Sequence, residues 1–172
     1  MKTVYLSLGS NMGDRAENIA RAVKALDARG IRVVRESSLY ETAPIAVRGD
    51  AWFLNCAVQA ETNIMPLQLM RTLLQIERDL GRKRRPLSSQ STGLKDPRII
   101  DIDILLFGES VVRAPEVEIP HPRMAERRFV LVPLNEIAAN VRHPVLDATV
   151  TELLASTPDR SQVRPYQSAQ EM

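Results

Sequence analysis

Cysteine is almost absent from this chain of 172 residues, and its scarcity limits both the chemistry and the compartment. A single cysteine, Cys56, cannot form an internal disulfide, so we expect a reducing, cytoplasmic environment. Because Cys56 lies in an apolar stretch without an evident base beside it, we interpret it as a small buried side chain rather than a nucleophile.

Long apolar runs are missing as well. No stretch approaches the ~20 apolar residues of a membrane-spanning helix, and the first residues lack the apolar centre of a signal peptide. The sequence contains neither a GxxxxGK[ST] loop nor a kinase Gly-rich loop, which excludes a P-loop enzyme and a protein kinase. The length and the 44% of hydrophobic residues suit one soluble domain. We therefore expect residues 1–172 to form a single catalytic domain, whose polar tail after about residue 157 is ordered only in part.

The net charge of +2 is small, but positive charge is concentrated in one segment. Between Arg82 and Arg98 there are six basic residues and one acidic residue, a local charge of 6 − 1 = +5, so the rest of the chain carries −3. The basic residues are Arg82, Lys83, Arg84, Arg85, Lys95 and Arg98. This distribution predicts an anionic ligand at the segment.

The pattern of apolar residues and turn signals predicts mixed helices and strands. Strands are expected at 3–8, 31–40, 52–60 and 98–107, helices at 15–28 and 66–80, partly helical segments at 129–137 and 150–155, and a long polar loop at 82–97. Because several strands follow one another without an intervening helix, we predict an α+β fold with a largely antiparallel sheet.

The strongest of these strands carries two carboxylates, Asp101 and Asp103, in an otherwise apolar run. Residues two apart on a strand point to the same face, so the two side chains emerge together, roughly 7 Å apart at Cα. We expect Ile99, Leu105 and Phe107 on that face too, which argues against a face open to solvent.

Two carboxylates on an apolar strand would be costly to bury without a counter-charge, and a hard divalent cation supplies one. Mg²⁺ commonly binds one or two carboxylates together with nucleotide phosphates. Arg98 precedes Asp101 by three residues, and guanidinium groups bind phosphate oxygens in pairs. The sequence therefore predicts a magnesium-dependent polyphosphate site at Asp101 and Asp103.

Two alternatives remain open at this point. A basic run is by itself most often a solvated cluster or a nucleic-acid patch, so the chain could be a non-enzymatic RNA-binding module. Such a module needs exposed aromatic residues on a sheet face, and the chain has only three Phe, three Tyr and one Trp. The other alternative is a different nucleotidyl or phosphoryl transferase that shares the metal site.

Short motifs occur in a definite order across residues 4–135. They are Leu8-Gly9-Ser10-Asn11, Tyr40-Glu41-Thr42-Ala43-Pro44, Phe53-Leu54-Asn55, Glu77, Gly81-Arg82-Lys83-Arg84, Pro97-Arg98-Ile99-Ile100-Asp101-Ile102-Asp103-Ile104-Leu105, Pro120-His121 and Arg127-Arg128-Phe129. The ordered set resembles the 6-hydroxymethyl-7,8-dihydropterin pyrophosphokinase family of folate biosynthesis. The PR-x-x-D-x-D-I-L block is its most specific part.

The resemblance implies a ferredoxin-like, three-layer α+β sandwich with a long basic lid loop at 82–97. It implies transfer of pyrophosphate from ATP to the hydroxymethyl group of 6-hydroxymethyl-7,8-dihydropterin, which gives AMP and the pterin diphosphate. Two Mg²⁺ ions would be the cofactors and ATP the co-substrate. The expected partners are these small molecules, without nucleic acid, membrane or an obligate protein partner.

The resemblance also assigns residues to roles. Asp101 and Asp103 are similar to the ligands of the two Mg²⁺ ions, and with Arg82, Arg84 and Arg98 they form the expected catalytic set. The expected ATP contacts are Glu77, Arg82, Arg84, Arg98, Ile104, His121 and Arg127. The expected pterin contacts are Thr42, Pro44, Ile45, Phe53, Asn55 and Phe129.

The chemistry of the expected pterin pocket agrees with these assignments. A pterin is a flat ring, so Phe53 and Phe129 could enclose its two faces. The amide of Asn55 offers both a donor and an acceptor to the polar edge of the ring. Apart from the resemblance, both phenylalanines would most often be core residues, Asn55 would satisfy local backbone, and His121 would be a turn residue.

One departure from the family concerns the expected lid. Family members commonly carry Trp-Gly before the Pro-Arg pair, where this chain has Lys95-Asp96, and the stretch 84–98 is longer than usual. We expect the lid to be open without ligands and to close over ATP, Mg²⁺ and the pterin, with Lys95 adding a cation in place of the flat indole.

Overall fold

The computed structural model describes residues 1–43, 51–81 and 98–168. Its elements are β1 (Lys2–Ser10), α1 (Arg15–Ala28), β2 (Ile31–Glu36), β3 (Tyr40–Thr42), β4 (Phe53–Thr62), α2 (Pro66–Asp79), β5 (Asp101–Phe107), β6 (Val112–Arg113), β7 (Glu118–Ile119), a 3₁₀ helix (Met124–Glu126), α3 (Arg128–Ala138), α4 (Val150–Ser156) and β8 (Val163–Pro165).

The main sheet has six strands in the order β5-β1-β4-β3-β8, with β2 also paired to β4. Every pairing in it is antiparallel. The chain order β1-α1-β2-β4-α2-β5 and the spatial order β5-β1-β4-β2 are those of a ferredoxin-like sandwich. The α+β prediction with an antiparallel sheet is therefore confirmed.

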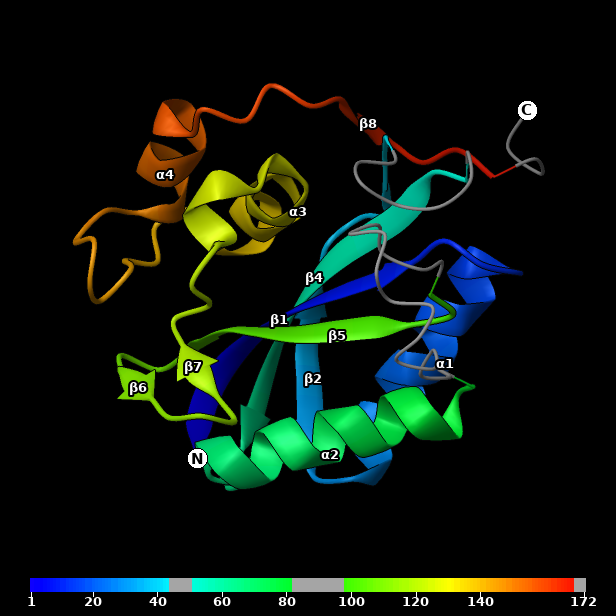
Figure 1. Ribbon diagram of the computed structural model, residues 1–172, viewed down its shortest axis with the longest axis horizontal. Coiled ribbons are helices and arrows are strands. Elements are labelled where there is room, and N and C mark those ends of the chain that lie inside the picture. Colours follow the sequence, from blue (N-terminus) through cyan, green and yellow to red (C-terminus); the bar gives the residue numbers. More distant parts are fainter. Residues whose placement is uncertain (44–50, 82–97, 169–172) are drawn as a thin grey trace, which may run out of the picture.

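Helices lie on both faces of this sheet, which makes three layers (Figure 1). One apolar cluster joins α1 and α2 to the side chains of Leu6, Leu8 and Ile104 on one face. A second cluster joins α3 to Tyr5 and Leu105 on the other face. We call this second face, which α3 covers, the α3 face; Asn55 and the two expected metal ligands lie on it.

The first two long helices begin and end where local signals predict. Asp14 caps α1 by accepting a hydrogen bond from the Glu17 backbone N–H, and Pro66 occupies the first turn of α2. Gly81, just past the end of α2, has a φ of +110°, a conformation that glycine adopts without strain. No helix in the described ranges is long and apolar enough to span a membrane.

The predicted strand at 31–40 is in fact two short strands, so this prediction was wrong in detail. The break lies at Ser37, whose backbone N–H donates to the Ala57 carbonyl while its hydroxyl accepts from the Ala57 N–H, each at 2.9 Å. A serine side chain thus replaces one backbone partner of β4, and the chain leaves the sheet edge before it returns as β3.

A shift of register corrects the expected position of Phe107. On β1, Leu6 pairs with Ile104 of β5, but the preceding residue, Tyr5, pairs with Leu106. Leu105 is therefore an extra residue of β5 that has no pairing partner on β1. Leu105 therefore stays on the α3 face, as predicted, whereas Phe107 packs in the opposite core with α1 and α2.

Candidate active site

The expected metal ligands and pterin contacts come together on the α3 face of three adjacent strands. Gly9 in β1 pairs with Asn55 of β4 on one side and with Asp101 of β5 on the other. Two residues back along β1, Ser7 pairs with Asp103. Because directly paired residues share a face, one row of the sheet carries a carboxylate, a glycine and a carboxamide.

Asp101 and Asp103 are partly exposed. The residues opposite them are small, Gly9 and Ser7, which leaves room beside the carboxylates. Two carboxylates that share a face repel each other and offer hard oxygen ligands, so the donor set fits a divalent cation such as Mg²⁺. Among the described residues no group of three or more His, Cys, Asp or Glu side chains could hold a metal ion.

Asn55 forms the centre of the expected acceptor pocket. Its side-chain Nδ2 donates a hydrogen bond of 2.7 Å to the hydroxyl of Thr42, and both residues are buried. Its Oδ1 lies over Gly9, where a Cβ atom would approach it to 2.7 Å. The hydrogen bond to Thr42 and the bare backbone of Gly9 together fix the carboxamide in one orientation.

Two aromatic side chains lie on the same side of the sheet. Phe53 is two residues from Asn55 on β4 and therefore shares its face, and it would contact a Cβ at Gly9 at 3.7 Å. Phe129, in the first turn of α3, packs against the core beneath that helix. The guanidinium of Arg127 lies 5.6 Å from the centre of the Phe129 ring. This places a cation beside one expected wall of the acceptor pocket.

The position of α3 over the sheet is fixed by a polar contact with β3. The hydroxyl of Tyr40 donates to Oε1 of Glu136 at 2.5 Å, and the Ser38 backbone N–H donates to Oε2 at 2.7 Å. Burial and the carboxylate of Glu136 raise the pKa of Tyr40 to about 12, so the phenol stays a donor at all ordinary pH values.

Glu77 connects α2 to the outer edge of β5. It is 2% exposed, and its Oε2 accepts the backbone N–H of Ile102 at 2.8 Å. Ile104 is buried, and its side chain packs in the core on the opposite face, so a nucleotide could meet only its backbone. Backbone N–H groups two residues apart on a strand point the same way, so the N–H of Ile104 points outward from the sheet edge, as the N–H of Ile102 does toward Glu77.

Arg98 is held at the entrance to β5 by a residue from β1's end. The side-chain Oδ1 of Asn11 accepts the Arg98 N–H at 2.6 Å, and the Asn11 N–H donates to the Arg98 carbonyl at 3.0 Å. These two bonds hold the backbone of Arg98, three residues before Asp101 in the chain, next to the end of β1.

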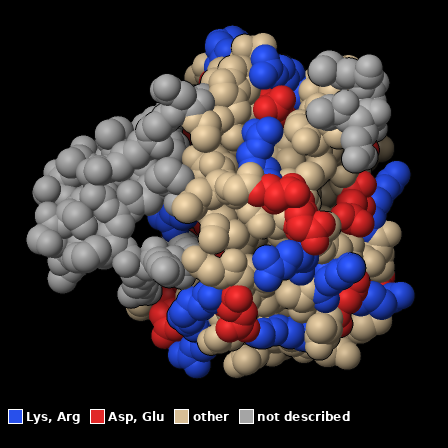
Figure 2. Space-filling model, turned by 90° about the vertical axis from the view of Figure 1, so that its right-hand side faces the viewer, with Lys and Arg blue, Asp and Glu red and all other residues tan. Residues whose placement is uncertain are grey.

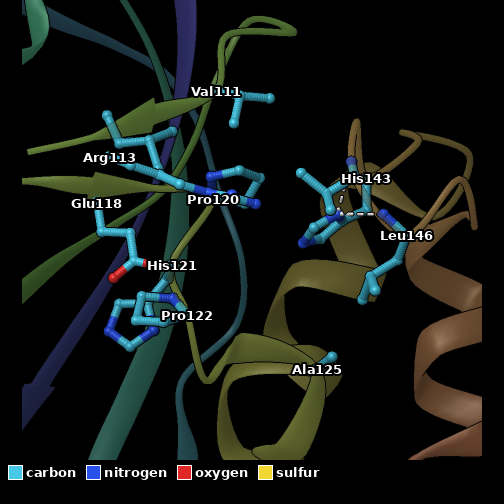
Figure 3. A pocket seen from close by; sticks show the side chains of 11 residues that line it. Val111, Arg113, Glu118, Pro120, His121, Pro122, Ala125, His143 and Leu146 are labelled. Atoms are coloured by element: carbon cyan, nitrogen blue, oxygen red, sulfur yellow. Dashed lines mark hydrogen bonds between the residues drawn. The ribbon is translucent and has the colours of Figure 1, made fainter.

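His121 lines a cavity of about 150 Å³ between the β6–β7 hairpin and the loop that precedes α4 (Figure 3). Its Nδ1 accepts the backbone N–H of Arg123 at 3.1 Å. Other lining residues include Arg113, Glu118 and His143. Neither Asp101, Asp103 nor Asn55 lines this cavity, so the cavity does not contain the carboxylates.

His143, across that cavity, gives a testable pH dependence. Its Nδ1 accepts the N–H groups of Val145 and Leu146 at 3.2 and 3.0 Å, and burial lowers its pKa below the ordinary value of 6.5. The unfolded chain then binds this proton at a higher pH than the folded chain, so stability is lost as the pH falls below about 6.5. We expect the free energy of unfolding to fall more steeply between about pH 7.5 and pH 5.5 in the wild type than in His143→Asn. Urea unfolding at several pH values measures this, and parallel curves would contradict it.

Four expected site residues lie outside the described residues: Pro44, Ile45, Arg82 and Arg84. The same is true of the basic loop at 82–97 and of Lys95 within it, so the lid remains a sequence-based expectation.

A comparison with known families decides what the site belongs to. The sequence model of the 7,8-dihydro-6-hydroxymethylpterin-pyrophosphokinase family matches residues 5–139. This chain belongs to that family. The stretch matched contains the row of Asp101, Gly9 and Asn55 and also Phe129.

Known members of the pyrophosphokinase family occur alone and as parts of longer proteins. The 2-amino-4-hydroxy-6-hydroxymethyldihydropteridine pyrophosphokinase of Bacillus subtilis is 40% identical over 145 residues, 84% of this chain and 83% of that protein. The folic acid synthesis protein of Dictyostelium discoideum is 38% identical over 156 residues, 91% of this chain but 22% of that protein. The chain thus spans between 19% and 25% of several curated relatives that it matches.

The fold agrees with a solved structure of the pyrophosphokinase family. A crystal structure of Plasmodium falciparum HPPK-DHPS superposes with a TM-score of 0.70 over 90% of this chain and 45% of that chain. At 18% identity this likeness supports the fold alone.

Gly9, which lies against the expected site residue Asn55, was not among the residues predicted for the site. Gly9 belonged to a matching motif, but the motif does not show that its Cα faces the amide of Asn55. A glycine inside a strand often marks a close approach by another group, and that signal was available in the run Leu8-Gly9-Ser10.

Proposed function

We propose that this chain transfers the terminal diphosphate of ATP to the hydroxymethyl group of 6-hydroxymethyl-7,8-dihydropterin, a step of folate biosynthesis, in the cytoplasm. The hydroxymethyl oxygen forms a bond to the β-phosphorus, the bond from the β-phosphorus to the α–β bridging oxygen breaks, and AMP leaves. The observation that carries the proposal is that a buried carboxamide on β4 and two carboxylates on β5 share one face of the sheet, with Gly9 and Ser7 of β1 paired to the carboxylates.

Two Mg²⁺ ions fit this function, and Asp101 and Asp103 are the residues that would hold them. When bound, the ions neutralise charge on the phosphates and on the attacking and leaving oxygens. We find no general base among the expected site residues, in keeping with phosphoryl-type transfer, which depends chiefly on positioning and electrostatics.

The remaining expected residues bind and orient the two substrates. Asn55 pairs with the polar edge of the pterin, and Phe53 and Phe129 cover its ring. On the nucleotide side, Arg98 and Arg127 bring positive charge, while Glu77 and the backbone of Ile104 border the adenosine. Arg82, Arg84, His121, Pro44 and Ile45 keep the roles that the resemblance implies.

Nucleic acid is not part of this proposal. Figure 2 shows Lys and Arg side chains mixed with Asp and Glu over the face that carries α1, rather than a continuous basic surface. Nucleic-acid interfaces are much more positively charged than this, so this one face does not have the charge of a nucleic-acid interface. We propose small-molecule substrates and no obligate protein partner.

Product analysis tests the proposed function. With ATP, Mg²⁺ and the pterin together, we expect AMP to form in step with loss of the pterin, and no AMP when either Mg²⁺ or the pterin is left out. Formation of ADP in place of AMP would show a different transferase.

The acceptor side is tested by Asn55→Ala, which should weaken pterin binding by about 1–3 kcal/mol because ring donors and acceptors lose their partner. ATP binding should change little. Asn135 offers a matched control, since its Oδ1 accepts from the Thr151 hydroxyl on the exposed surface. Calorimetry with each ligand separates the two effects. Equal losses for pterin and ATP would mean that Asn55 is structural.

A further inference from the structure

The C-terminal segment, residues 157–166, contacts two walls of the expected acceptor pocket, although none of its residues was assigned to the site. From α4 it runs past α3 to β8 at the edge of the sheet (Figure 1). The sequence analysis did not predict a strand there, because Val163–Pro165 is short and ends in a proline.

The first wall is the start of α3. Oδ2 of Asp159 accepts the backbone N–H of Arg128, the first residue of α3, at 2.7 Å, and Oδ1 accepts the Ser161 N–H at 2.9 Å. Arg128 returns the contact by donating from Nη1 to the Ser161 carbonyl at 3.2 Å. The residue before the helix makes no side-chain cap, so Asp159 supplies a partner and a negative charge at this helix end. Phe129 is the next residue of that turn.

The charge of Asp159 is retained in this position. Burial pushes the pKa of its carboxyl upward, but the hydrogen bonds from Arg128 and Ser161 outweigh burial and hold the pKa below its ordinary value. The contact therefore persists at neutral pH.

The second wall is β3, which is three residues long. It pairs with β4 on one side and with β8 on the other, where Thr42 is opposite Val163 and Glu41 is opposite Arg164. Without β8, this short strand would be the open edge of the sheet, where backbone opening is easiest. Thr42 is the residue that accepts the hydrogen bond of Asn55.

Arg164 contacts two residues, Trp52 and Glu41, each of which directly precedes an expected pocket residue in the chain. Its guanidinium lies 4.0 Å from the centre of the Trp52 ring, and its Nη2 is 3.6 Å from Oε1 of Glu41. Arg15 also contacts these two residues: its Nη1 donates to Oε2 of Glu41 at 3.1 Å and to the Trp52 carbonyl at 2.9 Å. Glu41 precedes Thr42 in the chain, and Thr42 accepts the hydrogen bond of Asn55.

We propose that residues 157–166 are a positioning element for the acceptor pocket and that Arg164 is its main positioning residue. The segment touches neither substrate and acts through Thr42 and Phe129. Through β3, Arg164 affects the pterin rather than ATP, because β8 and β5, which carries the carboxylates, lie at opposite edges of the sheet. Asp159 binds the N–H next to Arg127, an expected ATP contact, so its effect is not confined to the pterin. The inference rests on the proposed function.

The test compares Arg164→Ala and Asp159→Asn with Arg32→Ala in the full chain. Arg32 on β2 is the matched control, since it forms an exposed ion pair with Glu61 on β4. Loss of such an exposed pair has little effect on stability. We expect the KM for the pterin to rise about tenfold in both test variants, because small displacements of positioning groups are costly, while in Arg164→Ala the KM for ATP stays within about twofold. Arg164→Lys should recover only part of the loss, because lysine keeps the charge but not the flat guanidinium over Trp52.

The outcomes are separable. For Arg164→Ala, a pterin KM equal to that of Arg32→Ala, or equal increases in both KM values, overturns the inference. A lowered thermal midpoint with unchanged KM values would show a merely structural role and overturns it too. Failure of the proposed function would instead be seen in the wild-type chain, as an absence of AMP with ATP, Mg²⁺ and the pterin present, and the inference would fall with it.

Discussion

Replacing Asp103 with Asn is expected to lower turnover by on the order of 100-fold or more, and Asp101→Asn should do the same. Each change keeps the shape of the side chain and removes one charged oxygen ligand. The fold should survive, because both residues are partly exposed and a neutral amide relieves the repulsion between two carboxylates on one face. Without Mg²⁺, the midpoint of thermal unfolding should be equal to or above that of the wild type.

Steady-state rates over a range of Mg²⁺ concentrations measure this effect, together with unfolding in the presence and absence of Mg²⁺. Asp147→Asn is the matched control, since it makes the same chemical change at a side chain that is 86% exposed and paired with Arg142. Near-normal, Mg²⁺-dependent turnover in either Asp101→Asn or Asp103→Asn would exclude these residues as metal ligands.

Gly9→Ala is expected to weaken pterin binding by on the order of tenfold or more, with ATP binding nearly unchanged. The new Cβ would lie 2.7 Å from Oδ1 of Asn55, a distance at which something must move. Asn55 is 3% exposed and its amide is bonded to Thr42, so it can move only by breaking that hydrogen bond. The substitution therefore acts on the carboxamide rather than on the strand.

A double-mutant cycle isolates this mechanism. In the Asn55→Ala background the Cβ at position 9 no longer meets an amide oxygen, so Gly9→Ala should then cost little more. Calorimetric titration of the pterin into the wild type, both single variants and the double variant gives the coupling. Equal losses from Gly9→Ala in both backgrounds would show that it perturbs the backbone of β1 instead.

Features set by local signals could be predicted from the sequence. Pro66 and Gly81 mark the ends of α2, and the two-residue spacing of Asp101 and Asp103 sets their common face. The ordered motifs then indicated the family correctly. These predictions needed no knowledge of which strands are neighbours.

Features set by contacts between distant segments could not be predicted in this way. The position of Phe107 depends on a one-residue shift between β5 and β1, and the approach of Gly9 to Asn55 depends on the register of β1 and β4. The strand β8 forms only because β3 offers it an edge, and its own sequence has weak strand signals. The resulting contacts of Arg164 and Asp159 are likewise invisible in the sequence.

The most direct test of the central claim follows the β-phosphorus of ATP. The wild-type chain is incubated with Mg²⁺, the pterin and ATP that carries an isotopic label on its β-phosphate, and the products are separated. Our account predicts that the label moves to the pterin diphosphate while unlabelled AMP is released. Label found in ADP would show transfer of the γ-phosphoryl group, and label found in free pyrophosphate would show adenylyl transfer; either result would contradict the account.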